Sequence, residues 1–274
     1  MPTIPPSDRR QPHQARHVAE SFGADPERYD RTRPQYPHAL IDQIITSIPG
    51  RDVLDVGIGT GVSARPFQDA GYQVLGVEPD PRMAAFARER GFVVETAKFE
   101  DWDPAGRMFD AIIAGMTWHW VDPEAGAVKA AEVLRPDGLL ALFWNVHQPP
   151  VELAHEFAEV YQRVLPDTPF AAAPRDPVAG YSQILDTVSA SIKTTNAFTD
   201  PQRSRVDWER SYTSEEWLEQ VSTFGGHSTF EPEKLHQLLS GTKAAIDRSG
   251  GTFTVRYAAL TVTAHRSPER TASP

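Results

Sequence analysis

Residues 53–61 read Val-Leu-Asp-Val-Gly-Ile-Gly-Thr-Gly, and this stretch decides the fold. Its first four residues form a short, mostly apolar run that is typical of a strand buried on both faces. Gly57, Gly59 and Gly61 then indicate a tight turn, because glycine adopts backbone angles that other residues avoid and lets the chain approach a ligand closely. The helix expected next offers unpaired N–H groups and the positive end of its dipole. We therefore predict a ligand site where this strand ends.

The residues around this stretch alternate between strand and helix patterns. Short apolar runs predict strands at 53–56, 74–77, 92–94, 111–113 and 139–143, and helical stretches lie at 61–70, 81–90 and 123–134. Asp80-Pro81 and Asp122-Pro123 are good helix starts, since an Asp N-cap precedes a proline at the first helical position. Repeated βαβ units of this length predict an α/β fold with a doubly wound, mostly parallel sheet.

Beyond residue 146 the pattern is weaker. We expect helices at 151–165, 214–221 and 232–246, a loop at 166–178, and a late antiparallel strand at 252–263 whose partner comes from 192–208. The expected organisation is one domain at 21–265 between flexible tails at 1–20 and 266–274. Within that domain we distinguish an N-terminal lid segment (22–48), a ligand-binding core (51–146), a cap region (147–250) and the closing strand (251–264).

Composition excludes several classes of function. The net charge of −10 among 274 residues argues against binding to a phosphate backbone, so we expect no nucleic-acid partner. The chain has no cysteine, which removes disulfides, iron–sulfur clusters and thiolate catalysis. His155 lacks the second histidine of a zinc-protease motif, and we expect no metal. No apolar run is long enough for a membrane span, and residues 1–17 lack a signal-peptide core, so a cytoplasmic location is expected by default.

The glycine spacing narrows the choice of ligand. A dinucleotide-binding turn has the pattern Gly-x-Gly-x-x-Gly, whose third glycine would fall on Val62, whereas here it falls on Gly61. The turn therefore suits a ligand that carries a carboxylate and an amine rather than a pyrophosphate. Glu78 ends the second strand about twenty residues later, where an acidic side chain accepts both hydroxyls of a ribose.

With these residues, the chain resembles the class I S-adenosylmethionine-dependent methyltransferases of the type 11 family. The resemblance covers residues 22–146 and includes Phe-Asp-Ala-Ile-Ile-Ala at 109–114, Leu-Arg-Pro-Asp-Gly at 134–138 and Trp-His-Trp at 118–120. The Tyr…Arg-Pro-x-Tyr-Pro pattern at 29–37 is similar to the N-terminal segment of a bacterial and fungal subgroup that includes trans-aconitate methyltransferase-like enzymes.

The resemblance implies a Rossmann-like, seven-stranded sheet and S-adenosyl-L-methionine as cofactor, with S-adenosyl-L-homocysteine as product. It places the cofactor against Tyr29, Arg33, Asp55, Gly57, Gly59, Gly61, Glu78, Pro79, Met83, Phe99, Glu100 and Ala114. Many relatives have an acid that reaches the adenine amino group, but Lys98 occupies that position here. Adenine recognition then falls to the backbone of Phe99 and Glu100 with packing from Phe99 and Met83, unless a shifted register lets Glu100 or Asp101 supply the acid.

The expected chemistry is in-line transfer of a methyl group to a small-molecule acceptor, which needs alignment and exclusion of water more than acid–base help. His119 is the candidate general base, with a packing role between two tryptophans as the alternative. Trp118 and Trp120 line the acceptor pocket or belong to the core, and Arg33 pairs with a carboxylate of cofactor or acceptor or forms a surface ion pair. An NAD-dependent oxidoreductase and a catalytically silent scaffold remain as alternatives, and a monomer and a homodimer are both open.

Overall fold

The computed structural model describes residues 13, 16–166, 168 and 176–268. The chain divides into two compact units. Unit 1 comprises Met1–Pro34, Val146–Gln183 and Asp207–Ala258, and unit 2 comprises Gln35–Asn145, Ile184–Val206 and Ala259–Pro274. The stretch 21–265, which the sequence predicts as one domain, thus contributes to two units, and the expected lid segment 22–48 is divided between them at Pro34.

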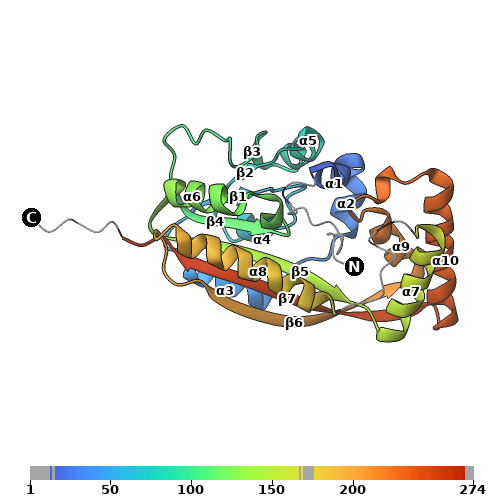
Figure 1. The fold of residues 1–274 in the computed structure, drawn as a ribbon. Coiled ribbons are helices and arrows are strands. Elements are labelled where there is room, and N and C mark those ends of the chain that lie inside the picture. The colour runs from blue at the N-terminus through green and yellow to red at the C-terminus, as the bar shows by residue number, and fades with distance from the viewer. Residues whose placement is uncertain (1–12, 14–15, 167, 169–175, 269–274) are drawn as a thin grey trace, which may run out of the picture. The chain divides into compact units, whose positions relative to one another are not determined.

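Unit 2 contains the strands that the sequence predicts (Figure 1). β1 (Asp52–Val56) pairs in parallel with β2 (Gln73–Val77) and with β4 (Phe109–Gly115). β3 (Val93–Glu95) pairs in parallel with β2, and β5 (Leu134–Gln148) with β4. These parallel pairings bring the carboxyl ends of β1, β2 and β4 to one edge of the sheet.

The complete sheet has seven strands in the order β3-β2-β1-β4-β5-β7-β6. β6 (Gln202–Thr213) and β7 (Thr252–His265) follow the parallel strands in the chain, and both, like β5, include residues of the two units. The predicted seven-stranded, mostly parallel sheet with a late antiparallel strand is confirmed.

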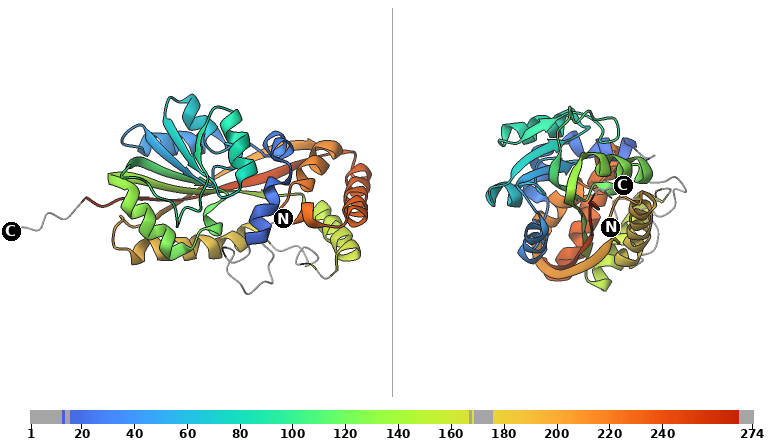
Figure 2. Two further views of the ribbon diagram at one scale, coloured as in Figure 1. Left: turned by 90° about the horizontal axis from the view of Figure 1, so that it is seen from above. Right: turned by 90° about the vertical axis from the view of Figure 1, so that its left-hand side faces the viewer.

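Short helices precede and connect the strands of unit 2. They are α3 (His38–Ser47), α4 (Arg65–Asp69), α5 (Pro81–Glu89) and α6 (Pro123–Val133), with a single 3-10 turn, η3 (Trp118–Trp120), after β4. The blue-to-teal helices α3, α4 and α5 lie on one side of the strands and the green α6 on the other (Figure 2). The Asp80 side chain accepts from the N–H of Arg82, and the Asp122 side chain caps α6 in the same way. Both predicted helix starts are therefore confirmed.

Unit 1 is built mainly from helices and the ends of long strands. Its helical elements are α1 (Arg16–Ser21), η2 (Phe22–Ala24), α2 (Pro26–Thr32), α7 (Val151–Val164), α9 (Ser214–Ser222), η5 (His227–Thr229) and α10 (Pro232–Arg248). Its core is rich in aromatic side chains, among them Phe157, Tyr212, Trp217, Phe224 and Tyr257.

Three expectations for the weaker regions need correction. Residues 16–20, expected within the N-terminal tail, belong to helix α1, where Val18 is buried. Helix α8 (Pro177–Thr194) occupies a stretch for which the sequence predicts no helix, and only the later part of 192–208 is a strand. Arg266, expected in the C-terminal tail, donates to the carbonyl oxygens of Ala131 and Ala197. The rest of the expected tails, 1–12, 14–15 and 269–274, lies outside the described residues, as do 167 and 169–175 of the expected loop.

Candidate functional site

The glycine turn after β1 has three residues in the left-handed backbone region. Gly57, Gly59 and Gly61 have φ values of 67°, 57° and 93°. A Cβ atom on Gly57 would lie 2.1 Å from the methyl group of Thr117, and one on Gly61 would lie 2.3 Å from the Phe92 ring. At Gly59, the nearest heavy atom to such a Cβ would be 4.0 Å away. Two of the glycines are therefore required by packing, while the middle one borders open space.

Glu78 joins this turn to the end of β2. Its side chain is buried, and its Oε2 accepts from the N–H of Gly59 at 2.9 Å while its Oε1 accepts from the N–H of Asp80 at 2.9 Å. Burial raises the pKa of the Glu78 carboxyl to about 7, against the opposing effect of these two hydrogen bonds. These two hydrogen bonds thus fix the orientation of the Glu78 carboxyl group at the sheet edge. The next residue, Pro79, is exposed.

Asp55 lies one strand position before Val56, fully buried at the same edge. Its Oδ2 accepts from the Ser63 hydroxyl at 2.8 Å, and its Oδ1 has no hydrogen-bond partner among the described residues. Burial raises the pKa of the Asp55 carboxyl to about 8, and the charge of Glu78 adds to this effect. Asp55 therefore holds a proton more readily than an ordinary aspartate at neutral pH.

The end of β4 closes the site from the other side of β1. Ala114 is fully buried, and Met116 has a φ of 56°, which turns the chain away from the strand. The Thr117 hydroxyl lies 3.1 Å from the carbonyl oxygen of Gly57 and 3.1 Å from that of Gly115. It therefore ties the segment after β4 to the glycine turn.

The residues expected around an adenine ring are mostly packed into unit 2. Met83 and Phe99 are buried, and the Phe99 ring contacts those of Trp102 and Trp118. Glu100 Oε1 accepts from the N–H of Asp122 at 2.9 Å. Lys98 and Asp101 are exposed and form a 3.9 Å ion pair with each other. Of the acidic side chains expected near the adenine, Glu100 therefore has one carboxylate oxygen that is hydrogen-bonded at the start of α6.

His119 differs from the general base that the sequence suggests. Its side chain is buried, and its Nδ1 accepts a hydrogen bond from the indole N–H of Trp144 at 3.1 Å. Burial lowers the pKa of His119 to about 3. The imidazole is therefore neutral at pH 7 and only a weak base, because a useful general base has a pKa near the working pH. The structure argues against His119 as a general base. Trp118 is fully buried and belongs to the core around Phe99.

Tyr29 and Arg33 belong to unit 1, whereas the glycine turn belongs to unit 2. The guanidinium carbon of Arg33 lies 4.3 Å from the centre of the Tyr29 ring and within 6 Å of those of Phe22 and Phe224, and one N–H donates to the carbonyl oxygen of Thr223 at 2.6 Å. Arg33 forms no ion pair with a carboxylate among the described residues, and its Nε has no partner there. The expected surface ion pair of Arg33 is therefore absent from the described part of the chain.

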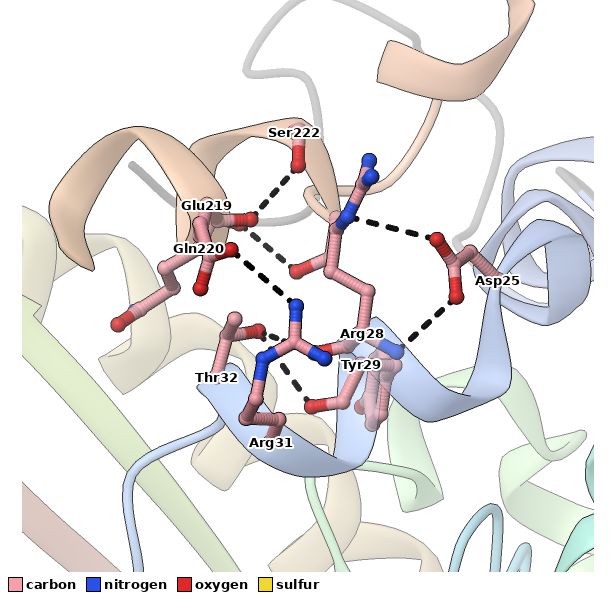
Figure 3. A network of polar contacts seen from close by, with 9 residues as sticks. Asp25, Arg28, Tyr29, Arg31, Thr32, Glu219, Gln220 and Ser222 are labelled. Carbon is pink, nitrogen blue, oxygen red and sulfur yellow. Dashed lines mark hydrogen bonds and ion pairs between the residues drawn. The ribbon is translucent and has the colours of Figure 1, made fainter. Parts of the chain in front are cut away.

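Helix α2, which carries Tyr29, contacts α9 within unit 1 (Figure 3). Arg31 donates to Glu219 Oε1 at 3.2 Å, and the Asp25 side chain caps the helix by accepting from the N–H of Arg28 at 3.0 Å. Both partners of the Arg31–Glu219 pair are about half exposed, so this pair contributes little to stability.

Sequence reasoning missed three residues of the site: Ser63, Thr117 and Trp144. Ser63 and Thr117 bond to residues on other elements, and nothing in their local sequence distinguishes them from serines and threonines without such a bond. Trp144 continues the apolar run of β5, where a tryptophan indicates only burial. Among the described residues, no group of histidine and acidic side chains is arranged to hold a metal ion. No described helix is both long and apolar enough to cross a membrane.

Comparisons with known proteins agree with this geometry. Residues 54–142, which include the glycine turn and Glu78, match the family described as "Methyltransferase domain". An uncharacterised methyltransferase of Mycobacterium bovis is 29% identical over 210 residues, covering 76% of this chain and 78% of the relative. A demethylmenaquinone methyltransferase of Tropheryma whipplei is 36% identical over 123 residues, covering 43% of this chain and 51% of that protein.

Among solved structures, a protein from Anaeromyxobacter dehalogenans described as a type II methyltransferase superposes with a TM-score of 0.60 at 20% identity, covering 86% of this chain and 99% of that one. At this identity the likeness supports the fold alone. The strand order, the glycine turn with its buried acid, and the matched domain together identify the enzyme class. Residues 54–142 therefore form a methyltransferase domain, and the chain is similar to S-adenosylmethionine-dependent methyltransferases of class I.

Proposed function

We propose that this enzyme transfers the methyl group of S-adenosyl-L-methionine to a small-molecule acceptor by in-line displacement at the carboxyl edge of β1, β2 and β4. The observation that carries the proposal is the cradle at Gly59, where a Cβ would find no heavy atom closer than 4.0 Å although both neighbouring glycines are tightly packed. The buried Glu78 carboxyl is hydrogen-bonded to the N–H of that same glycine. An open backbone beside a fixed acid fits the ribose and methionine parts of the cofactor.

Each residue of the cradle has a task that follows from its position. The Glu78 carboxylate accepts the two ribose hydroxyls, and the two backbone N–H groups bound to it keep its orientation. The buried Asp55 Oδ1, which has no partner among the described residues, is available to the amine of the methionine part. When bound, the cofactor supplies a methyl group on a positively charged sulfur. The remaining work of the protein is to align the acceptor and to exclude water.

A small-molecule acceptor is supported by charge and by the side chains of unit 1. The net charge of −10 disfavours a nucleic acid. Arg33 presents a cation beside three aromatic rings without a carboxylate partner among the described residues, which suits the carboxylate of the cofactor or of an acidic acceptor. We further propose that residues 22–37 form a segment that becomes ordered when ligand binds, as a lid does.

Calorimetry with S-adenosylhomocysteine and with NAD tests the proposal. We expect S-adenosylhomocysteine to bind at micromolar concentration and to raise the melting temperature by mass action, and NAD to do neither at equal concentration. Tighter binding of NAD than of S-adenosylhomocysteine would overturn the assignment. A screen of small acids, phenols and amines for a mass gain of one methyl group then identifies the acceptor.

A further inference from the structure

His119 and Trp144 form a buried pair on neighbouring elements of unit 2. Trp144 follows Phe143, which pairs with Gly115 at the end of β4, and His119 lies in the 3-10 turn after that strand. The indole N–H of Trp144 can only donate, and it donates to His119 Nδ1 at 3.1 Å. A ring nitrogen that accepts a hydrogen bond carries no proton, so the neutral imidazole has its proton on Nε2. Trp144 therefore fixes the tautomer of His119.

The other ring nitrogen of His119, Nε2, has no such partner among the described residues. His119 is 6% exposed, and its Nε2 is buried without a hydrogen-bond partner among the described residues. Burial disfavours the charged ring and lowers its pKa to about 3, so the proton on Nε2 is not joined by a second one near neutral pH. A buried donor without an acceptor is costly, and each such group in a native protein calls for an explanation.

The position of His119 suggests that explanation. Thr117, two residues earlier, bonds to the carbonyl oxygen of Gly57, so this loop is attached to the glycine turn. The ring of Trp120 lies 4.8 Å from that of His119 and adds an aromatic surface. His119 therefore lies two residues from a side chain that is bonded to the glycine turn.

We propose that His119 binds the methyl acceptor as a fixed hydrogen-bond donor, with Trp144 holding the ring so that Nε2–H donates to an oxygen of the acceptor. The identity of the ligand in this inference rests on the proposed function, whereas the tautomer of His119 is independent of it. His119 is then a binding and specificity residue, and Trp144 is the residue that positions it. The acceptor class that follows is a molecule with a carboxylate, carbonyl or phenolate oxygen, and purely cationic amines are disfavoured.

The tautomer can be measured on the protein without ligand. Nitrogen-15 NMR of the histidine rings, with His119 assigned by its loss in His119→Gln, should show the neutral Nε2–H form throughout pH 5 to 8. In Trp144→Phe, Nδ1 is released, and we expect the ring to populate the Nδ1–H form or to become protonated as the pH falls. A neutral Nδ1–H form, or protonation between pH 6 and 7, in the unmodified protein would overturn the inference.

Donation to a ligand needs a second measurement. With the protein saturated by S-adenosylhomocysteine, benzoate should move the Nε2–H proton signal downfield, whereas benzylamine, of similar size but without an oxygen, should leave it unchanged. Benzoate affinity should fall at least about tenfold in His119→Leu and stay within about threefold in His119→Gln, whose amide can still donate. Equal loss in both variants indicates a basic or purely packing role and contradicts the proposal, as does an unmoved proton signal. Failure of S-adenosylhomocysteine to bind would instead contradict the proposed function and leave the tautomer result standing.

Discussion

Replacement of Glu78 is the most direct test of how the cofactor is held. The carboxylate is expected to accept two ribose hydroxyls, and a hydrogen bond to a charged group contributes about 1.5–3 kcal/mol. Both oxygens already accept from backbone N–H groups, at Gly59 and Asp80, so part of this energy is shared. Since about 1.4 kcal/mol corresponds to a factor of ten, we expect at least a tenfold weaker affinity for S-adenosylhomocysteine in Glu78→Ala.

The same substitution also affects stability, and this effect has to be separated from binding. Glu78→Ala leaves the N–H groups of Gly59 and Asp80 without their acceptor, at about 1–3 kcal/mol for each group that stays buried. Removal of a buried carboxyl whose pKa is raised from 4.5 to about 7 offsets part of this loss, increasingly as the pH rises between these values and fully above them. Glu78→Gln keeps the size of the side chain and one acceptor oxygen, so it should fold more stably than Glu78→Ala while still binding the cofactor less tightly.

Isothermal titration calorimetry gives the affinity, and circular dichroism with thermal unfolding shows whether each variant is folded. Glu89→Ala is the matched control, because Glu89 is an exposed acid on the helix that begins after Glu78. It should bind S-adenosylhomocysteine as the unmodified protein does. A folded Glu78→Ala protein with unchanged affinity would show that the ribose lies elsewhere, and the assignment of the site would fail.

Three further results are expected. Gly57→Ala should lower the free energy of unfolding, measured by chemical denaturation, by about 1–3 kcal/mol. Gly59→Ala should lower it less, because only a Cβ at Gly57 meets Thr117. Equal losses in the two variants would contradict the packing argument. The pKa of Asp55 is raised from 3.8 to about 8, so the contribution of its carboxyl group to stability is complete below pH 4 and is lost as the pH rises to 8. Asp55→Asn should therefore increase the melting temperature more at pH 8 than at pH 5. An equal increase at both pH values would refute the effect of burial. Hydrogen exchange across residues 22–37 should slow on addition of S-adenosylhomocysteine if this segment is a lid, whereas equal protection leaves it only a packing role.

The parallel part of the fold could be predicted from local signals. Apolar runs of strand length alternate with helices that begin at Asp-Pro, and the side chains of Asp80 and Asp122 do cap those helices. Helix α8 was missed although a signal exists: Tyr181, Leu185, Val188 and Ile192 are buried and recur at helical spacing. The neighbouring Gly180 and the serines around it weakened that pattern.

In the candidate site, too, some residues can be predicted from the local sequence, whereas the state of others depends on contacts with distant residues. The glycine turn and Glu78 follow from spacing along the chain, because each belongs to a strand end whose position the sequence reveals. The state of His119 does not, since its burial and its bond to Trp144 depend on the pairing of β4 with β5. A histidine between two tryptophans has the same local sequence whether it is an accessible base or a buried donor.

The two compact units interleave along the sequence, since the chain passes from one to the other after Pro34, Asn145, Gln183, Val206 and Ala258. No single cut therefore separates them: a fragment that ends at Asn145 carries the glycine turn but lacks the stretches of unit 2 that come later in the chain. Attempts to graft unit 1 from one relative onto unit 2 of another have to exchange several separate stretches together.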